Sequence, residues 1–540
     1  MKICHIFQKD NDIPKDKTDS FAVEDYRGFG SIHKAEAITN QIFLDRWNQE
    51  YIRKITYKDY EVSWSVYDII YRSFSLPFTE IERLIDILNS YEIVILHSVE
   101  EKYANVLQHI CYNKDFRNER KVNLGKKIKR FFIYLISFFI TIPSIFYFAI
   151  SKKKIGIWTS DMIFQGTDSD FRFNRLYERL KQNKIKFVEF VRIHSLGNVF
   201  KNILIRKRLV IYYQPISYFL SFFLSGRQKK IAPKSIYNSV LLSYDYDNQV
   251  LLRVIPIFQF IYKLIGLRSL WVLYFSSRNA PLVIAAKASG IKTIGMKHGA
   301  GTKSYDIFEF ITPYWSTKKL GPDVFGVWSL WYLEYFKKYS KILSQESIKY
   351  AGLLRPYTLK SKTIEDNYQT KEKGKIRLLL ISEPLTDPRE IVPYLEQIIN
   401  DPRFSLAIKV RPMTRDLFYE NIIKLLPIVK SWPKYEGDIF EEGEKADIFI
   451  GSHSTALPEA SLLGKLSIFL KTEKWGDYFE VRDLVREMDM LVERPEKIIE
   501  HIFTRIQKEK ELRTIEKIRE RYFGENKDGT DWAVRELNIE

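Results

Sequence analysis

Cysteine is scarce in this sequence: Cys4 and Cys111 are the only two among 540 residues, and neither belongs to a C-x-x-C pair. A disulfide-stabilised scaffold is therefore excluded, and a structural zinc site is disfavoured. The sequence also lacks a Walker A phosphate loop and the G-x-S-x-G turn of serine hydrolases. Because its first residues, MKICHIFQKD, lack the apolar core of a signal peptide, we expect the bulk of the chain to remain in the cytosol.

Acidic residues are fewer than basic ones: 67 Asp and Glu stand against 85 Lys and Arg, a net charge of +18. This excess favours an anionic partner, such as a membrane surface, a phosphorylated substrate or a nucleic acid. The basic residues flank apolar runs and do not form a recognisable RNA-binding motif, so we expect no nucleic-acid partner. A hydrophobic content of 45% is enough for sizeable cores.

Charge is absent from residues 131–150, which follow a basic run and precede the sequence SKKK. Twenty apolar residues match the length of a membrane span, but Pro143 lies inside the run and basic residues flank both ends. A second apolar run, 209–225, contains Pro215. Two such segments favour elements that lie in one leaflet of a membrane, and buried helices of a large core are the alternative.

Strand-like and helix-like segments alternate from residue 154 onward and again from residue 376, which predicts parallel βαβ units. The predicted organisation is an N-terminal α/β module of unknown role (1–115), a basic and apolar membrane-associating segment (116–153), a first α/β domain (154–325), a bridge and linker (326–370), and a second α/β domain with closing helices (371–540).

The sequence ADIFIGSHSTALPEASLLG, residues 446–464, reads as a buried strand, a polar turn and a helix. Ligands of parallel sheets bind beyond the carboxyl ends of strands, and a helix N-terminus attracts anions. The hydroxyls of Ser452, Ser454 and Thr455 therefore predict a site for a nucleotide phosphate, and Glu459 can accept the hydroxyls of a ribose. Simple helix capping, with Glu459 complementing the helix dipole, is the alternative.

Two further polar segments follow predicted strands. His298, in IGMKHGAGTKS, can act as a general base near neutral pH or bind a phosphate oxygen, unless it only holds its loop. Lys409 and Arg411, in AIKVRP, alternate on a strand and can neutralise phosphate, unless they line a solvated edge.

Taken in order, KHG, YAGLLRP, KVRP and ADIFIGSHSTALPEASLLGK resemble the motifs of GT-B glycosyltransferases over roughly residues 154–480. The most similar group comprises surface-polysaccharide and capsule glycosyltransferases and CDP-glycerol glycerophosphotransferases. The resemblance implies an α/β fold with two Rossmann-like domains facing across a cleft, the donor nucleotide on the C-terminal one and the acceptor on the other. It also implies no essential metal and no cofactor besides the nucleotide-sugar donor, which is a substrate.

The resemblance also implies roles for single residues. Ser454 and Thr455 match the phosphate-binding pair, and Glu459 matches the carboxylate that binds the ribose or nucleotide. His298 matches the cleft histidine and Lys409 the lysine on the donor phosphate.

The sequence departs from this pattern at three positions. Arg411 stands where the family usually has His, Lys297 replaces the common Gln, and Leu466 replaces a frequent Pro. The first departure puts the phosphate contact in doubt, and the last affects packing only. Gly464 retains the glycine that ends the helix.

From these motifs we expect a bacterial-type glycosyltransferase that moves a sugar to a lipid-linked or growing surface-polysaccharide acceptor. The basic and apolar segments favour the cytoplasmic face of the inner membrane, in a peripheral or monotopic arrangement. His298 is the preferred base for the acceptor hydroxyl, and Asp161 and Asp168 are alternatives.

Three other interpretations stay open at this point. A metal-dependent GT-A enzyme needs a D-x-D motif, which Asp245 with Asp247 or Asp168 with Asp170 can supply. An alditol-phosphate or glycerol-phosphate transferase would share the nucleotide half of the site. A membrane-associated protein without enzymatic activity is compatible with the charge.

Overall fold

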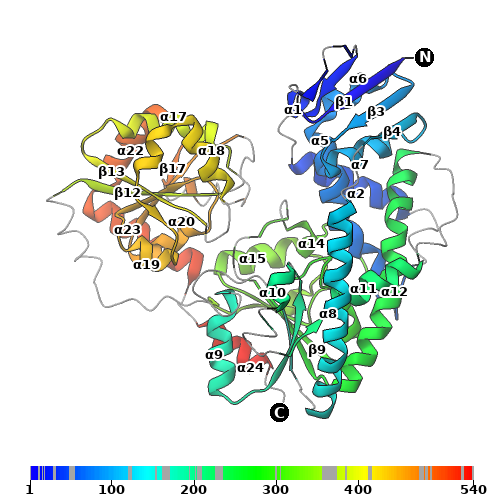
Figure 1. Ribbon diagram of the computed structural model, residues 1–540. Helices are drawn as coiled ribbons and strands as arrows, with labels where there is room; N and C mark the ends of the chain where they lie inside the picture. The colour runs from blue at the N-terminus through cyan, green and yellow to red at the C-terminus, as the bar shows by residue number, and fades with distance from the viewer. Residues whose placement is uncertain are drawn as a thin grey trace.

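The computed structural model describes the chain from Lys2 to Leu537, and the statements below refer to that part. It leaves out residues 10–11, 15, 18, 28–31, 48–54, 120–123, 152–154, 161–170, 194, 201, 203–208, 225–234, 298, 300, 304–305, 355–373, 384–385, 412–415, 474–479, 481–484, 487–488 and 525–527. The described chain contains three β-sheets, and every strand pair in them is parallel (Figure 1).

The N-terminal module is built on a four-stranded sheet. Its strands, in spatial order, are β2 (Ser20–Ala22), β1 (Ile3–Phe7), β3 (Ile93–His97) and β4 (Asp115–Asn118). Its α-helices are α1 (Val23–Tyr26), α2 (Ile32–Trp47), α4 (Tyr67–Ile70), α5 (Leu76–Glu80), α6 (Glu82–Leu88) and α7 (Glu101–Ile110).

A seven-stranded sheet forms the first Rossmann-like domain. In spatial order its strands are β11 (Ile348–Tyr350), β10 (Val324–Val327), β9 (Lys292–Met296), β8 (Ser269–Val272), β5 (Ile155–Ser160), β6 (Phe187–Arg192) and β7 (Ile211–Tyr212). The chain first runs outward from β5 to β7 and then returns to add β8 on the other side of β5. The sheet continues to Tyr350, so the bridge predicted from residue 326 begins inside it.

Eight α-helices belong to this part of the described chain. They are α8 (Leu124–Ser151), α9 (Asn174–Gln182), α10 (Leu196–Phe200), α11 (Gln214–Leu224), α12 (Ile236–Ile265), α13 (Ala280–Lys287), α14 (Ile307–Phe310) and α15 (Leu330–Tyr339). The apolar run 131–150 lies in α8, and the run 209–225 contains β7 and α11. Pro215 is the second residue of α11, where a missing N–H costs nothing, whereas Pro143 lies inside α8.

A six-stranded sheet forms the second Rossmann-like domain. In spatial order its strands are β14 (Lys434–Tyr435), β13 (Phe404–Lys409), β12 (Ile376–Ile381), β15 (Ile448–Gly451), β16 (Leu466–Leu470) and β17 (Leu491–Val492). Counted along the chain this is the order 3-2-1-4-5-6, as in dinucleotide-binding domains. Strands β15 and β16 are buried along their whole length, which explains why Ser467 is the only polar side chain in them.

The helices of the second domain follow its strands. They are α17 (Pro388–Ile399), α18 (Leu417–Leu425), α19 (Ile439–Gly443), α20 (Ala456–Glu459), α22 (Ile498–Arg505) and α23 (Lys508–Ile518).

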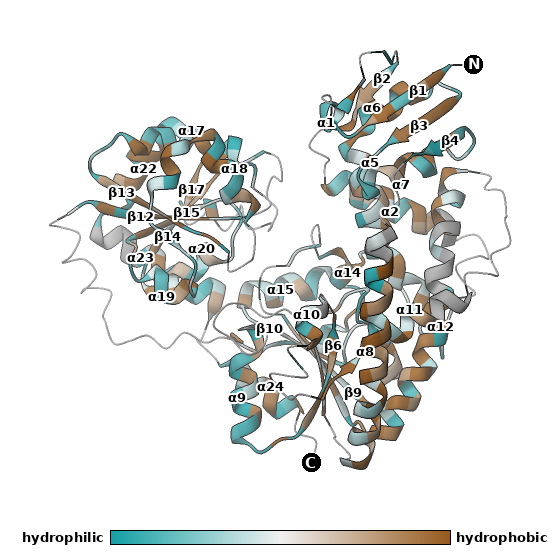
Figure 2. Ribbon diagram, viewed as in Figure 1, coloured by the Kyte–Doolittle hydropathy of each residue, from teal (hydrophilic) through white to brown (hydrophobic). Residues whose placement is uncertain are grey.

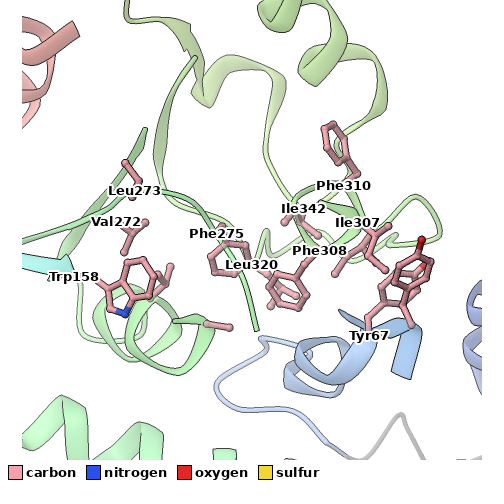
Figure 3. Packing of buried hydrophobic residues seen from close by; sticks show 14 of the residues in the cluster. Tyr67, Trp158, Val272, Leu273, Phe275, Ile307, Phe308, Phe310, Leu320 and Ile342 are labelled. Atoms are coloured by element: carbon pink, nitrogen blue, oxygen red, sulfur yellow. The ribbon is translucent and has the colours of Figure 1, made fainter. Parts of the chain in front are cut away.

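The N-terminal module and the first Rossmann-like domain share a hydrophobic core. Tyr67 of the module belongs to the same buried cluster as Ile307 and Phe308 of α14 (Figure 3). Nearby, the Ser277 hydroxyl donates a hydrogen bond to Asp68 at 3.2 Å. Shared apolar burial of this kind indicates that the two parts fold as one unit.

The C-terminal end of the chain returns to the first Rossmann-like domain. The last helix, α24 (Gly529–Leu537), packs on α9, β8 and β9. Arg179 forms an ion pair with Asp531 at 3.1 Å, and Lys292 pairs with Glu536 at 3.0 Å. The predicted range 371–540 for the second domain thus includes a helix whose contacts lie in the first.

The predicted fold class is confirmed by these sheets: the chain is α/β, with two Rossmann-like domains behind an N-terminal α/β extension. Among the described residues, Ile128–Ser151 of α8 is the one helical stretch long and apolar enough to cross a membrane, with a mean hydropathy of 2.1. In the structure one side of this helix packs against β7, α11 and α12.

Candidate functional site

The carboxyl ends of the central strands of the second domain meet at one edge. Ile381 of β12 is paired with Lys409 of β13, and Leu380 is paired with Ile450 of β15. The chain order reverses between β12 and β15, which is the point where open α/β sheets bind their ligands. The predicted residues 409, 411 and 452–455 therefore all lie at or just after the ends of strands at or next to this point.

The turn after β15 divides its polar side chains between the interior and the surface. Ser452 is buried, and its hydroxyl contacts that of Thr386 in the loop after β12. His453 is also buried, with Nε2 at 2.8 Å from the Thr472 hydroxyl. Ser452 and His453 thus join the ends of β12, β15 and β16.

Ser454 and Thr455 remain partly exposed at the start of α20. The Ser454 hydroxyl accepts a hydrogen bond of 3.3 Å from the N–H of Ala456, whereas Thr455, the N-cap residue, makes no such capping bond. Capping by Ser454 is therefore present, as the alternative interpretation expected. The hydroxyl of Thr455 takes no part in this cap.

The helix that follows is short and ends as predicted. Four α-helical residues of α20 continue into a 3₁₀ turn, Ala460–Leu463, and Gly464 closes it with φ of +69°. Such a left-handed backbone favours glycine.

Glu459 lies at the end of α20 and is partly exposed. Burial raises the pKa of Tyr522 well above its usual value, and the charge of Glu459 adds to the shift. Tyr522 in turn packs on Trp328 of the first Rossmann-like domain, with ring centres 5.5 Å apart. Glu459 is therefore near enough to the junction between the two domains to act electrostatically on Tyr522.

Lys409 is buried at the end of β13, where its Nζ donates a hydrogen bond of 2.6 Å to the carbonyl of Val410. Burial lowers the pKa of Lys409, against the opposing charges of Asp438 and Glu442. Arg411 is exposed and bound to Glu383 at 2.8 Å. Both predicted cations thus lie near the edge, each already held by a neighbouring group.

The loop after β12 supplies site residues that the sequence analysis missed. Ser382 donates to both carboxylate oxygens of Asp416, at 2.8 and 2.6 Å, and Asp416 accepts from the N–H of Arg411 at 3.0 Å. Together with the buried Glu383 this network fixes the ends of β12 and β13 to each other. The signal was a Ser-Glu pair directly after an apolar strand in the same domain.

In the first Rossmann-like domain, Lys297 follows β9 and is buried in an ion triad. Its Nζ lies 2.5 Å from Asp306 and 2.5 Å from Glu309. Burial raises the pKa of Glu309 to about 7, while the two carboxylates hold the pKa of Lys297 above its usual value in spite of its burial. Glu309 also accepts a hydrogen bond of 3.2 Å from the N–H of Phe275 after β8.

This triad fixes both sides of the turn that contains His298. An added side chain at Gly301 would lie 2.6 Å from the Lys297 Nζ, so glycine allows the close approach. His298 itself lies outside the described residues. The same holds for three acids of this domain that were predicted to act in catalysis or metal binding, namely Asp161, Asp168 and Asp170.

The alternative D-x-D pair, Asp245 and Asp247, lies inside α12 rather than after a strand. Positions two apart on a helix are about 200° apart around its axis, so this pair does not form a strand-end metal motif. Among the described residues no cluster of three or more His, Cys, Asp or Glu is arranged to hold a metal ion.

All three parts of the molecule meet beside the turn after β9. Lys303 lies 3.9 Å from Glu480 of the second domain, and its backbone N–H donates to the Tyr335 hydroxyl at 3.2 Å. Burial raises the pKa of Glu36 of the N-terminal module, and the charge of Lys303 opposes that shift. The segment after β9 is therefore in contact with the second domain and within electrostatic range of the N-terminal module.

No family model matches this chain, and no curated protein sequence matches it. Solved structures that are similar include MurG of Acinetobacter baumannii and the UDP-GlcNAc 2-epimerase of Neisseria meningitidis bound to UDP-GlcNAc, each with a TM-score of 0.43 and 12% identity over 71% of this chain and 99% of the other. Anabaena HepE in complex with UDP and glucose has a TM-score of 0.40 and 10% identity over the same shares. At these values the similarity identifies neither a family nor an activity.

Proposed function

We propose that this chain is a GT-B glycosyltransferase that takes a sugar from a nucleotide donor. The observation that carries the proposal is the 3-2-1-4-5-6 order of the second sheet, with polar loops meeting where that order reverses. The hydroxyl contact between Thr386 and Ser452 joins the two loops that flank this point. The sequence motif over residues 446–464 adds the family resemblance.

In this proposal the donor phosphates bind at the start of α20. Thr455 and Ser454 offer hydroxyls there, and Lys409 and Arg411 supply positive charge from the neighbouring strand. These groups would stabilise the charge that develops on the leaving nucleotide phosphate. Glu459 would accept the ribose hydroxyls.

The acceptor would bind to the first Rossmann-like domain. We propose His298 as the base that takes the proton of the acceptor hydroxyl, with Asp161 or Asp168 as alternatives. Through Asp306 and Glu309, Lys297 would hold the turn that carries His298. The acceptor class, a lipid-linked or growing bacterial surface polysaccharide, follows from the motif resemblance.

We also propose that the enzyme works at the cytoplasmic face of a membrane, with α8 lying in the plane of one leaflet. The buried side of α8 recurs every three or four residues, and its members are Tyr134, Ser137, Thr141, Ser144 and Phe148. Thr141 accepts a hydrogen bond of 3.0 Å from the N–H of Tyr212, which ties the helix to β7. A helix attached to the sheet along one side cannot be surrounded by lipid.

The opposite side of α8 is apolar and exposed. Its members are Ile128, Phe132, Phe139, Phe146 and Ile150, and Figure 2 shows hydrophobic residues along the length of the helix. Lys129 and Arg130 are exposed at its N-terminal end. An apolar stripe with basic residues beside it matches a helix in the interface of an anionic membrane.

Thermal-shift binding across a donor panel tests the proposed activity. The panel contains CMP, CDP, UDP, GDP, CDP-glycerol and common nucleotide sugars, each with and without EDTA. We expect one nucleotide and its sugar to raise the melting temperature selectively, with no effect of EDTA.

Each other outcome of this panel has a meaning. Stabilisation that requires a metal would favour the metal-dependent alternative through Asp168 and Asp170. Stabilisation by CDP-glycerol alone would indicate an alditol-phosphate transferase. The absence of any shift would contradict the proposed nucleotide site.

A further inference from the structure

The N-terminal module has a reversal of strand order of its own. The chain places β2 on one side of β1 and later places β3 on the other side (Figure 1). Open parallel sheets bind their ligands near the carboxyl ends of the strands at such a point. Helices normally cover both faces of a parallel sheet, but the connection from β1 to β2 contains no α-helix among its described residues.

Four side chains from four segments of the module meet at this point and form the histidine cluster. They are His5 of β1, His97 at the end of β3, Lys17 of the β1–β2 connection and Glu119 directly after β4. Nδ1 of His5 lies 2.9 Å from Nε2 of His97, and Nζ of Lys17 lies 3.4 Å from each of these nitrogens. On the other side of the His97 ring, Nδ1 lies 2.9 Å from the carboxylate of Glu119.

The surrounding residues hold this cluster in place. The ring of Phe7, at the end of β1, stacks on the ring of His97, with centroids 4.4 Å apart. Ser98 directly after β3 has a φ of +57°, a strained backbone that is uncommon outside glycine and frequent at binding sites. Gln8 directly after β1 has a buried amide nitrogen that makes no hydrogen bond among the described residues.

The N–H groups that meet in the cluster outnumber the lone pairs that can accept them. A neutral imidazole has one N–H and one lone pair. Because Nδ1 of His97 faces the carboxylate of Glu119, the hydrogen-bond network assigns the proton to Nδ1 and the lone pair to Nε2. The Nδ1–H of His5 and the ammonium group of Lys17 then both donate toward that one lone pair. An oxygen-rich anion at this place would accept hydrogen bonds from both.

The charges of the cluster also favour an anion. Burial lowers the pKa of both imidazoles, and the charge of Lys17 lowers it further, against the opposing charge of Glu119. A bound dianion would reverse these shifts, because an opposite charge stabilises the protonated imidazole. Two imidazolium rings and Lys17 together exceed the single charge of Glu119, and a phosphate dianion matches the excess. A metal cation would be repelled by the ammonium group.

We propose that His5, His97 and Lys17 bind the phosphate group of a small-molecule ligand, with Glu119 orienting the ring of His97. The site lies in the N-terminal module, whereas the proposed donor site lies in the second Rossmann-like domain. The inference therefore does not depend on the proposed function.

Calorimetric titration of the full chain in phosphate-free buffer tests the site, with inorganic phosphate, sulfate and acetate as probes. We expect wild type to bind phosphate and sulfate more tightly than acetate. K17Q and H97Q should each weaken phosphate binding about tenfold or more, because a charged hydrogen-bond donor is lost. K17Q should keep the melting temperature of wild type, so it tests the site even if H97Q does not fold.

Proton uptake on binding is a second readout, which a merely structural role of the histidines would not change. Sulfate does not titrate near neutral pH, so its binding enthalpy in two buffers of different ionisation enthalpy reports the protons that the protein takes up. We expect uptake by wild type at pH 7.5, because the imidazoles are neutral before the dianion binds and become protonated beside it. H5Q and H97Q should each take up fewer protons.

Lys9→Gln is the matched control, since Lys9 is an exposed lysine of the same connection. It should bind phosphate like wild type, and a loss equal to that of K17Q would overturn the inference. Acetate bound as tightly as phosphate would overturn phosphate as the ligand class.

A phosphate affinity of K17Q and H97Q equal to that of wild type, or no binding of phosphate, would also overturn the inference. Phosphate bound only at the proposed donor site would give the first of these results. The nucleotide panel is independent of the titration. A chain that binds a nucleotide but fails this titration would retain the proposed function and lose only the site in the N-terminal module.

Discussion

At the scale of single residues, Lys297 illustrates how burial decides a role. The sequence presents it as a variant of the family's Gln beside His298, and nothing local indicates carboxylates around it. In the structure Asp306 and Glu309, nine and twelve positions further along the chain, enclose it in contacts of 2.5 Å. Since Glu309 is also buried, Lys297 is the one cation among the described residues that forms an ion pair with that carboxylate.

Replacement of Lys297 by Met should therefore lower the free energy of unfolding by about 3–5 kcal/mol, because it leaves a buried carboxylate without a counter-charge. Urea denaturation followed by circular dichroism measures the change. The double variant K297M/E309L should recover part of the loss, since it removes the orphaned charge as well. A K297M protein as stable as wild type would show that the triad contributes nothing to stability.

The residues of the proposed donor site were predictable in position but not in orientation. Ser452, Ser454 and Thr455 had to lie at a sheet edge because they follow a fully apolar strand in a βαβ series. The inward turn of Ser452 could not be read from the sequence, because its partner Thr386 lies 66 positions earlier. Lys409 likewise lies where the sequence predicts. Its hydrogen bond to a backbone carbonyl could not be predicted from the alternation of side chains along the strand.

At the scale of elements, α8 combines a long apolar sequence with two different sides. Hydropathy along the sequence averages over both sides and therefore indicates a membrane span as readily as an interfacial helix. The structure adds that the side with Ser137 and Thr141 packs against β7, which supports the proposed interfacial helix.

Exchanging Phe139, Phe146 and Ile150 for Gln should reduce binding to anionic vesicles about tenfold or more, because their exposed fractions of 63%, 62% and 86% supply apolar contact with lipid. Co-sedimentation with vesicles of phosphatidylglycerol and phosphatidylcholine measures it. The control exchanges three exposed apolar residues of the second domain for Gln, namely Leu417, Leu425 and Ile428. An equal loss of vesicle binding in both variants would contradict an in-plane helix. Wild-type protein that is released from the membrane by detergent alone would contradict it as well.

Strands β12, β15 and β16 were predictable because parallel strands buried on both faces have mostly apolar sequences, in which Arg377 and Ser467 are the polar residues here. Strands β10 and β11 were not, since four and three residues within a segment rich in Trp and Tyr give no clear period. Because the sequence did not predict these two strands, the predicted end of the first α/β domain is residue 325, whereas its sheet continues to Tyr350.

At the scale of the whole molecule, the chain crosses between its two Rossmann-like domains more than once. After α23 it leaves the second domain, where Arg519 donates a hydrogen bond of 2.6 Å to the carbonyl of Ser461, and α24 then packs on the first. Tyr522 lies between these contacts, beside Glu459 and Trp328. Helix α20, at which we propose the donor binds, is thereby connected to the domain that would hold the acceptor.

Hydrogen–deuterium exchange of the full chain with and without the nucleotide selected by the donor panel tests the central claim most directly. We expect slower exchange in the loops that follow β12 and β15, within residues 382–390 and 451–460, because a ligand at the point of reversed strand order contacts both. Protection confined to the edge of the first sheet, with these two loops unchanged, would contradict a donor site in the second domain.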